Sequence, residues 1–192
     1  MVKTTRSWMV VMPGLVAVVA CLALAGVASP VEAQMQGPSS PPATASATVA
    51  GKALSIRYSA PSVRGRQIFG AGGLLSQDPT YPVWRAGANE ATTLTTEASL
   101  EIGALRLPPG RYSLWVLVED PNAWQLIVNR QTGQTGLEYD PSQDVGRVPM
   151  RMSAPASPVE RLTYTITDQG GGRGELRLEW ERHVAVVPFT AR

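Results

Sequence analysis

Apolar and polar residues alternate along most of this chain, and that pattern restricts its fold more than any other feature of the sequence. Leu54, Ile56 and Tyr58 alternate with polar neighbours, and segments 159–167 and 175–181 repeat the pattern. Residues two apart lie on the same face of a β-strand, so each segment predicts a strand with one buried face and one face in water. No stretch of ten or more residues shows a convincing helical period. The sequence therefore predicts an all-β protein.

The arrangement of these strands favours an antiparallel β-sandwich or a jelly-roll-like single domain. Segments 112–118 and 124–128 are apolar on nearly both faces, and we expect them at the centre of a sheet. Pro149 interrupts the alternating segment 147–152 and indicates an edge strand, because proline cannot donate a ladder hydrogen bond. Turns rich in Gly, Pro, Asp and Asn separate the strands at roughly 8–12-residue intervals, which is typical of this architecture.

The N-terminal segment 1–33 has the order of a secretory signal peptide. Lys3 and Arg6 precede an apolar run at 8–28, and a small-x-small sequence then ends at Ala33. We therefore predict cleavage after Ala33 and an exported protein, either periplasmic, extracellular or envelope-associated. No membrane insertion is expected after cleavage.

Cys21 is the only cysteine, and cleavage removes it together with any prospect of disulfides or thiol catalysis. The alternative is a retained anchor, either the uncleaved N-terminal segment or a lipidated Cys21. Residues 34–49 are uncharged and rich in Pro, Ser and Ala, and this composition predicts a flexible linker. The β-sandwich domain is then expected at residues 50–192.

Composition excludes several classes of function. The formal net charge at pH 7 is +2, too small for the basic surface that nucleic-acid binding requires, so we predict no nucleic-acid partner. His183 is the only histidine, which excludes a multi-histidine metal site within one chain. Its place at the start of an apolar segment favours a strand-edge residue with an ordinary hydrogen bond. We predict neither a metal nor a cofactor.

The densest polar cluster lies between residues 84 and 93 and is the predicted ligand site. Its aromatic ring, guanidinium, amide, carboxylate and hydroxyl groups are those that saccharide sites use. If the site is catalytic, Glu90 is the candidate acid–base group, with Arg85 or Asp140 as its partner. The structural alternative is that Glu90 pairs with Arg85 or binds loop N–H groups. The predicted ligand-binding residues are Trp84, Arg85, Asn89, Glu90, Thr92 and Thr93.

A second, weaker candidate is a turn rich in arginine. Arg64 and Arg66, with Arg57 nearby, have the guanidinium geometry to bind an anionic ligand through paired hydrogen bonds. Ion pairs with glutamates on neighbouring strands are the preferred alternative. Those glutamates are Glu90, Glu97 and Glu101.

A third candidate follows Tyr139. Asp140 and Asp144 form a weak calcium-like pair. Two carboxylates without a clear third ligand make a poor metal site, so we interpret Asp140 first as a turn residue.

Specific strings extend across the predicted domain. The most distinctive is Trp-Arg-Ala-Gly-Ala-Asn-Glu-Ala-Thr at 84–92, and the strings at 58–66, 107–114 and 144–148 accompany it. Together they resemble a bacterial family known as domain of unknown function 2911, over about residues 53–189. The resemblance implies a secreted or envelope-anchored protein. It implies no activity and no catalytic residues.

These observations lead to a first functional hypothesis and two alternatives. The hypothesis is an extracytoplasmic binding or envelope-associated domain, with a carbohydrate or cell-wall fragment as the first ligand class to test. The first alternative is a cofactor-free hydrolase or lyase that uses Glu90. The second is a structural partner-binding domain, which predicts a large exposed apolar patch.

Overall fold

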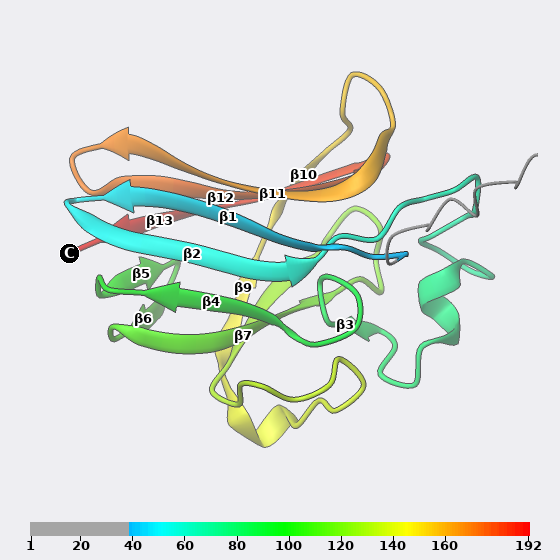
Figure 1. Ribbon diagram of the computed structural model, residues 1–192, viewed down its shortest axis with the longest axis horizontal. Coiled ribbons are helices and arrows are strands. Elements are labelled where there is room, and N and C mark those ends of the chain that lie inside the picture. Colours follow the sequence, from blue (N-terminus) through cyan, green and yellow to red (C-terminus); the bar gives the residue numbers. More distant parts are fainter. Residues whose placement is uncertain (1–38) are drawn as a thin grey trace, which may run out of the picture. The chain divides into compact units, whose positions relative to one another are not determined.

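Two antiparallel β-sheets pack face to face in the computed structural model, which describes residues 39–192 (Figure 1). The first sheet has the strand order β1-β2-β4-β7-β8-β9, with the short β3 beside β7. The second has the order β11-β12-β13-β5-β6, with β10 beside β13. The predicted all-β sandwich is confirmed. The predicted signal segment 1–33 and Cys21 lie outside the described residues.

The strands have the following bounds. The first sheet contains β1 (Pro42–Val49), β2 (Lys52–Ser59), β3 (Val83–Trp84), β4 (Thr92–Thr96), β7 (Gly110–Leu117), β8 (Gln125–Asn129) and β9 (Asp144–Pro149). The second contains β5 (Leu100–Ile102), β6 (Leu105–Leu107), β10 (Arg151–Ser153), β11 (Val159–Gly170), β12 (Arg173–Glu181) and β13 (His183–Ala191). The helical elements in residues 39–192 are two 3₁₀ turns, η1 (Leu74–Gln77) and η2 (Pro141–Gln143), and neither is long and apolar enough to cross a membrane.

The core lies between the sheets and is built by the two-residue alternation. Leu54 and Ile56 of β2 face it from one sheet, and Leu176, Leu178 and Trp180 of β12 face it from the other. Their polar neighbours along each strand face outward. Burying one such side chain contributes about 1.5–3 kcal/mol, so the alternating strands together supply most of the force that holds the sheets together.

An aromatic cluster occupies one end of this core. Trp84 stacks on Trp180 with ring centroids 5.5 Å apart, and Phe69 packs between Trp84, Trp124 and Trp180. His183 stacks on Trp124 at 5.0 Å. All three tryptophans are at most 2% exposed, so their rings belong to the fold.

A second, smaller apolar cluster covers the outer face of β7 and β8. It explains why segments 112–118 and 124–128 are apolar on nearly both faces: one face meets the core and the other meets the loop 130–143 and β3. The central placement predicted for these segments is confirmed. The cluster consists of Val83, Ala91, Trp115 and Ile127, with Leu117 and Tyr139 packed against it.

The first β-strand begins nearer the N-terminus than the sequence predicts. Residues 42–49 were expected to belong to a flexible linker, but they form β1 and pair with β2 in register from Pro42–Ser59 to Val49–Lys52. That expectation is wrong for residues 42–49. The reason is that Ala and Ser/Thr alternate there, and small alanines such as Ala45 and Ala47 suffice to pack an edge strand on the core. Pro42 is tolerated because it is the first residue of an edge strand, where its missing N–H removes no ladder hydrogen bond.

Pro149 lies at the end of β9, which is an edge strand of the first sheet, as predicted. The segment 147–152 is nevertheless not one strand. It breaks at Met150, where the chain passes from β9 in the first sheet to β10 in the second. Alternation cannot reveal such a crossing, because both halves keep the same period.

Candidate functional site

A cleft of about 380 Å³ opens on the outer face of the first sheet. Its floor is formed by the ends of β1, β2, β4 and β7, and its walls by the loop before β4 and by Gly133 of the loop 130–143. The residues that line it are mostly polar or charged. They belong to Thr44, Arg57, Tyr58, Ser59, Glu90, Thr93 and Arg111, with Pro42, Ala43 and Ala91 completing the lining.

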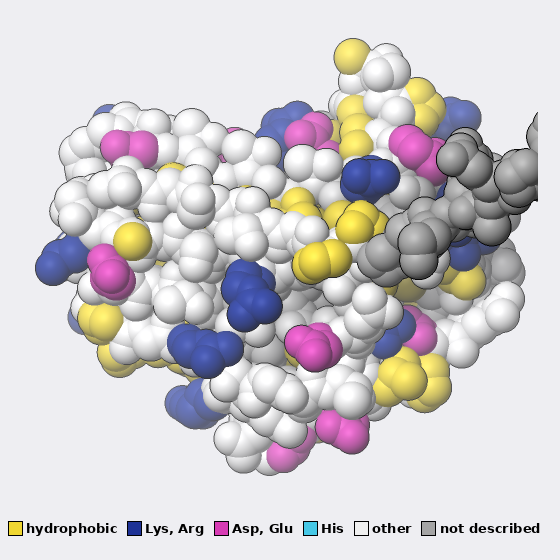
Figure 2. All heavy atoms as spheres, viewed as in Figure 1, with side chains coloured by type: hydrophobic (Ala, Val, Ile, Leu, Met, Phe, Trp, Pro, Cys, Tyr) yellow, Lys and Arg dark blue, Asp and Glu magenta, His cyan; other side chains and the backbone are white. Residues whose placement is uncertain are grey.

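Strand register brings two distant arginines to this cleft. Arg57 on β2 lies opposite Thr93 on β4, and Arg111 on β7 lies opposite Thr95, two residues further along β4. From standard sheet spacings, their Cα atoms are about 10 Å apart across the sheet and about 7 Å apart along it. In Figure 2, basic side chains gather where Figure 1 places β2, β4 and β7. Within residues 39–192, neither Arg57 nor Arg111 forms an ion pair.

Glu90 contributes the carboxylate of the cleft. Its backbone is held by main-chain contacts with the loop above it: Ala91 N donates to Gln134 O at 3.3 Å, and Gly136 N donates to Asn89 O at 2.9 Å. The Glu90 side chain is exposed, and it forms no ion pair with any residue of 39–192. The expected structural pair with Arg85 is therefore wrong. The main chain, not the carboxylate, fixes this loop.

The structure divides the predicted ligand-binding residues among three environments. Glu90 and Thr93 line the cleft. Trp84 is 2% exposed and its indole N–H donates to Gly87 O at 3.0 Å, so it is no stacking platform for a sugar. Thr92 is also buried, and its hydroxyl donates to Ala86 O at 3.1 Å. Alternation accounts for this division, because neighbouring residues of a strand point to opposite faces.

Arg85 and Asn89 lie outside the first cleft but close to it. The Arg85 guanidinium donates two hydrogen bonds to Asp78, at 2.9 and 3.1 Å, and faces a second cleft of about 340 Å³. Asn89 Nδ2 donates to Ser59 Oγ at 3.2 Å, on the rim of the first cleft. The predicted catalytic pairings of Glu90 with Arg85 or Asp140 are not assembled, since neither partner lines the cleft that contains Glu90.

Hydrogen bonds between its own residues stabilise the arginine-rich turn. Arg66 donates from Nε to Val63 O at 3.0 Å and from Nη2 to Ser62 O at 2.7 Å. The Arg64 backbone N–H donates to Glu160 at 2.9 Å. Ion pairs of Arg57, Arg64 and Arg66 with Glu90, Glu97 or Glu101 do not form in the described part of the chain. Of the three arginines, only Arg57 lines the first cleft, and Arg66 lines the second.

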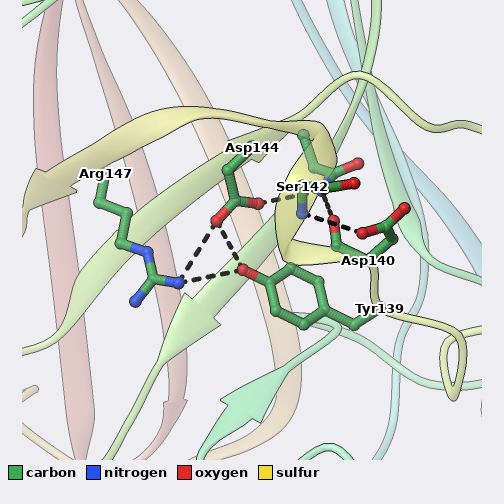
Figure 3. Close-up of polar contacts among 6 residues, drawn as sticks. Tyr139, Asp140, Ser142, Asp144 and Arg147 are labelled. Carbon is green, nitrogen blue, oxygen red and sulfur yellow. Dashed lines mark hydrogen bonds and ion pairs between the residues drawn. The ribbon is translucent and has the colours of Figure 1, made fainter.

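Asp144 is the centre of a polar network beside the sheet edge (Figure 3). The Tyr139 hydroxyl donates to Asp144 Oδ2 at 2.6 Å, and Arg147 Nη2 donates to both groups at 3.2 and 3.3 Å. Asn129 Nδ2 donates to Asp144 Oδ1 at 2.9 Å. Burial, followed by the hydrogen bond to Asp144, raises the pKa of Tyr139 to about 12.

Asp140 serves as the turn residue that the sequence favours. It precedes η2 and accepts a hydrogen bond from Ser142 N at 2.9 Å, and hydrogen bonding with Ser142 lowers the pKa of Asp140. Among residues 39–192 there is no group of three or more His, Cys, Asp or Glu side chains placed to hold a metal ion. The Asp144 carboxylate is instead engaged by Asn129, Tyr139 and Arg147.

A row of polar residues links this network to the cleft. Thr93, Ser113, Asn129 and Asp144 lie opposite one another on β4, β7, β8 and β9. Ser113 Oγ accepts hydrogen bonds from Trp115 Nε1 at 2.9 Å and from Gln134 Nε2 at 3.2 Å. In the sequence, Ser113 is a single serine within an apolar strand. It does not reveal which residues lie opposite it on the neighbouring strands.

His183 begins β13, as expected, but its side chain makes no ordinary hydrogen bond with any residue of 39–192. Its Nδ1 lies 3.6 Å from Glu181 Oε2 and has no hydrogen-bond partner in the described part of the chain. The ring packs against Phe69 and Trp124. Burial lowers the pKa of His183, while the nearby Glu181 carboxylate opposes that shift.

Comparison with known proteins adds one finding to this geometry. The sequence model of the family described as "Protein of unknown function (DUF2911)" matches residues 40–189. The chain belongs to the DUF2911 family. The match begins just before β1, so it includes the strand that composition had suggested was a linker. Searches of curated proteins and of solved structures found no match for this DUF2911 protein.

Proposed function

We propose that this DUF2911 domain binds a small hydroxylated ligand in the outer-face cleft, with saccharides and cell-wall fragments as the first class. The observation that carries the proposal is the cleft itself. It is concave, its volume is near the lower end of the roughly 300–1,000 Å³ that ligand sites occupy, and Arg57, Glu90 and Arg111 all line it. Within residues 39–192, none of these three forms an ion pair, so their charges stay free for a ligand.

Hydrogen-bonding groups dominate this lining, and they suit a polyhydroxylated ligand better than an apolar one. Glu90 accepts hydrogen bonds from hydroxyl groups, while the arginines donate to ring or hydroxyl oxygens. Thr93 adds a hydroxyl from the strand between them. The N-terminal sequence supports export, and an exported domain meets saccharides and cell-wall fragments outside the cytoplasm.

The two alternatives have less support. A hydrolase or lyase that uses Glu90 needs a second acid–base group, and among residues 39–192 no other carboxylate, histidine or cysteine lines the cleft. Tyr58 lines it too, but its hydroxyl is engaged by Tyr164 N at 3.2 Å. A partner-binding domain needs a contiguous apolar patch. In the described chain, the large apolar side chains that are exposed are Leu74, Tyr81 and Leu137, each only 37–50% exposed.

Glu90→Gln tests the proposal against a matched control. We expect titration calorimetry on a panel of saccharides and cell-wall fragments to show saturable binding without product formation. Glu90→Gln removes charge-assisted hydrogen bonds to the ligand and should weaken binding about tenfold. Glu138→Gln makes the same change on an exposed residue outside the cleft and should leave affinity unchanged. Failure of the whole panel to bind would refute the proposed function.

A further inference from the structure

The two arginines of the cleft carry more positive charge than a neutral sugar requires. Among residues 39–192, some arginines at the sheet surface pair with carboxylates, as in Arg151–Glu175 and Arg177–Glu179, whereas exposed strand arginines such as Arg106 and Arg161 form no ion pair. Arg57 and Arg111 line one cavity and have no such partner among residues 39–192. Two guanidinium groups and one carboxylate, that of Glu90, leave this cavity with a net positive charge, which favours an anionic ligand at the arginine end.

The chemistry of these side chains specifies what kind of anion fits. A guanidinium is planar and presents paired N–H groups that match the two oxygens of a carboxylate. Thr93 lies opposite Arg57, on the strand that separates the two arginines, and its hydroxyl donates to Ala91 O at 3.3 Å, which leaves the oxygen able to accept a hydrogen bond. This end of the cleft therefore provides donors for an acidic group and an acceptor for a neighbouring hydroxyl.

The cleft is also electrically polar along its length. Glu90 precedes Thr93 by three residues, which corresponds to about 10 Å along an extended chain. Its carboxylate repels an acidic group and accepts hydrogen bonds from hydroxyls. A ligand with its acid group at the β2 and β7 end and its hydroxyls toward Glu90 satisfies both ends at once.

We infer that the ligand is an acidic saccharide whose carboxylate is held by Arg57 and Arg111. The inference rests on the proposed function of the cleft. It specifies in addition that the ligand is negatively charged and that Arg57 and Arg111 bind its charged group. It also assigns orientation: the acid group lies at the arginine end and the remaining hydroxyls lie toward Glu90.

The test compares a uronic-acid disaccharide with its neutral counterpart on the full chain, by titration calorimetry at low and high salt. The acidic sugar should bind at least about tenfold more tightly, and this preference should shrink at high salt because screening weakens exposed charge pairs. Arg57→Gln and Arg111→Gln should each abolish most of the preference, because each weakens binding of the acidic sugar much more than binding of the neutral one. Arg57→Lys keeps the charge but loses the paired donors, so it should retain part of the preference.

Arg106→Gln is the matched control, because Arg106 is exposed on β6 and does not line the cleft. Circular dichroism of each variant checks that the fold is retained. Equal binding of acidic and neutral sugars would overturn the inference and leave the proposed function standing. Binding of neither sugar, nor of any other saccharide, would remove both. Inorganic phosphate or sulfate that binds as tightly as the uronic acid would show a general anion site and overturn the saccharide assignment.

Discussion

Tyr139→Phe removes a single hydroxyl from the network that surrounds Asp144. That hydroxyl donates to Asp144 at 2.6 Å and accepts from Arg147 at 3.2 Å. The ring packs against Trp115, with centroids 5.0 Å apart, and phenylalanine preserves that contact. A hydrogen bond to a charged group contributes about 1.5–3 kcal/mol. Because Tyr139 is only partly buried, we expect the variant to lose about 1.5 kcal/mol of unfolding free energy at pH 8.

The same hydroxyl predicts how stability changes in alkali. The folded-state pKa of Tyr139 is raised from 10.0 to about 12, so its contribution is complete below pH 10 and is lost as the pH rises from 10 to 12. Each tenfold change in the ionisation constant corresponds to about 1.4 kcal/mol. Solvent screening of this partly exposed group reduces the total to about 1–1.5 kcal/mol. The stability gap between wild type and Tyr139→Phe should therefore nearly close by pH 12.

Urea unfolding followed by tryptophan fluorescence at pH 8, 10 and 11.5 measures this gap directly. Tyr81→Phe is the control: Tyr81 is 37% exposed, and its hydroxyl makes no hydrogen bond in the described part of the chain, so the variant should match wild type throughout. The reasoning is refuted if Tyr139→Phe unfolds within 0.5 kcal/mol of wild type at pH 8, or if the gap persists unchanged at pH 11.5.

Three further predictions concern other parts of the fold. Gly136→Ala would place a Cβ against Arg85 Cδ and 2.7 Å from Asn89 O, so urea unfolding should show a loss of about 1–3 kcal/mol. The lowered pKa of His183 means that stability is complete above pH 6.5 and falls as the solution is acidified; melting temperatures from pH 8 to 5 should fall less in His183→Gln than in wild type. A chain shortened to begin at Ala50 lacks β1 and its buried Val49, and it should be less stable by at least about 2 kcal/mol than one that begins at Ser39.

Most of the fold follows from residue patterns, because alternation decides which face of a strand is buried. The strands at 54–58, 159–167 and 175–181 lie where their period places them. Alternation does not identify β1, because its inward residues are alanines and a segment of Ala, Ser and Thr has the composition of a linker. Pairing with β2 supplies the hydrogen bonds that make such a strand stable, and pairing is not visible in a local window.

The candidate site was predictable only in part, for a related reason. Glu90 and Thr93 were found because they lie in a dense polar string, but the same string includes Trp84 and Thr92, which point into the core. Arg111 was missed altogether. Its place beside Arg57 depends on the order β2-β4-β7 and on register, which no single segment encodes.

The loop 130–143 has a consequence for the thermodynamics of binding. Gln134 ties it to Ser113, Tyr139 ties it to Asp144, and main-chain bonds fasten it to the residues on either side of Glu90. These contacts form within the protein itself, so the loop's conformational entropy is lost during folding rather than at the moment a ligand arrives. A preorganised wall of this kind leaves more of the contact energy to appear as affinity. Association should accordingly resemble the entry of a small molecule into a rigid receptor, with little change in backbone dynamics around the cleft.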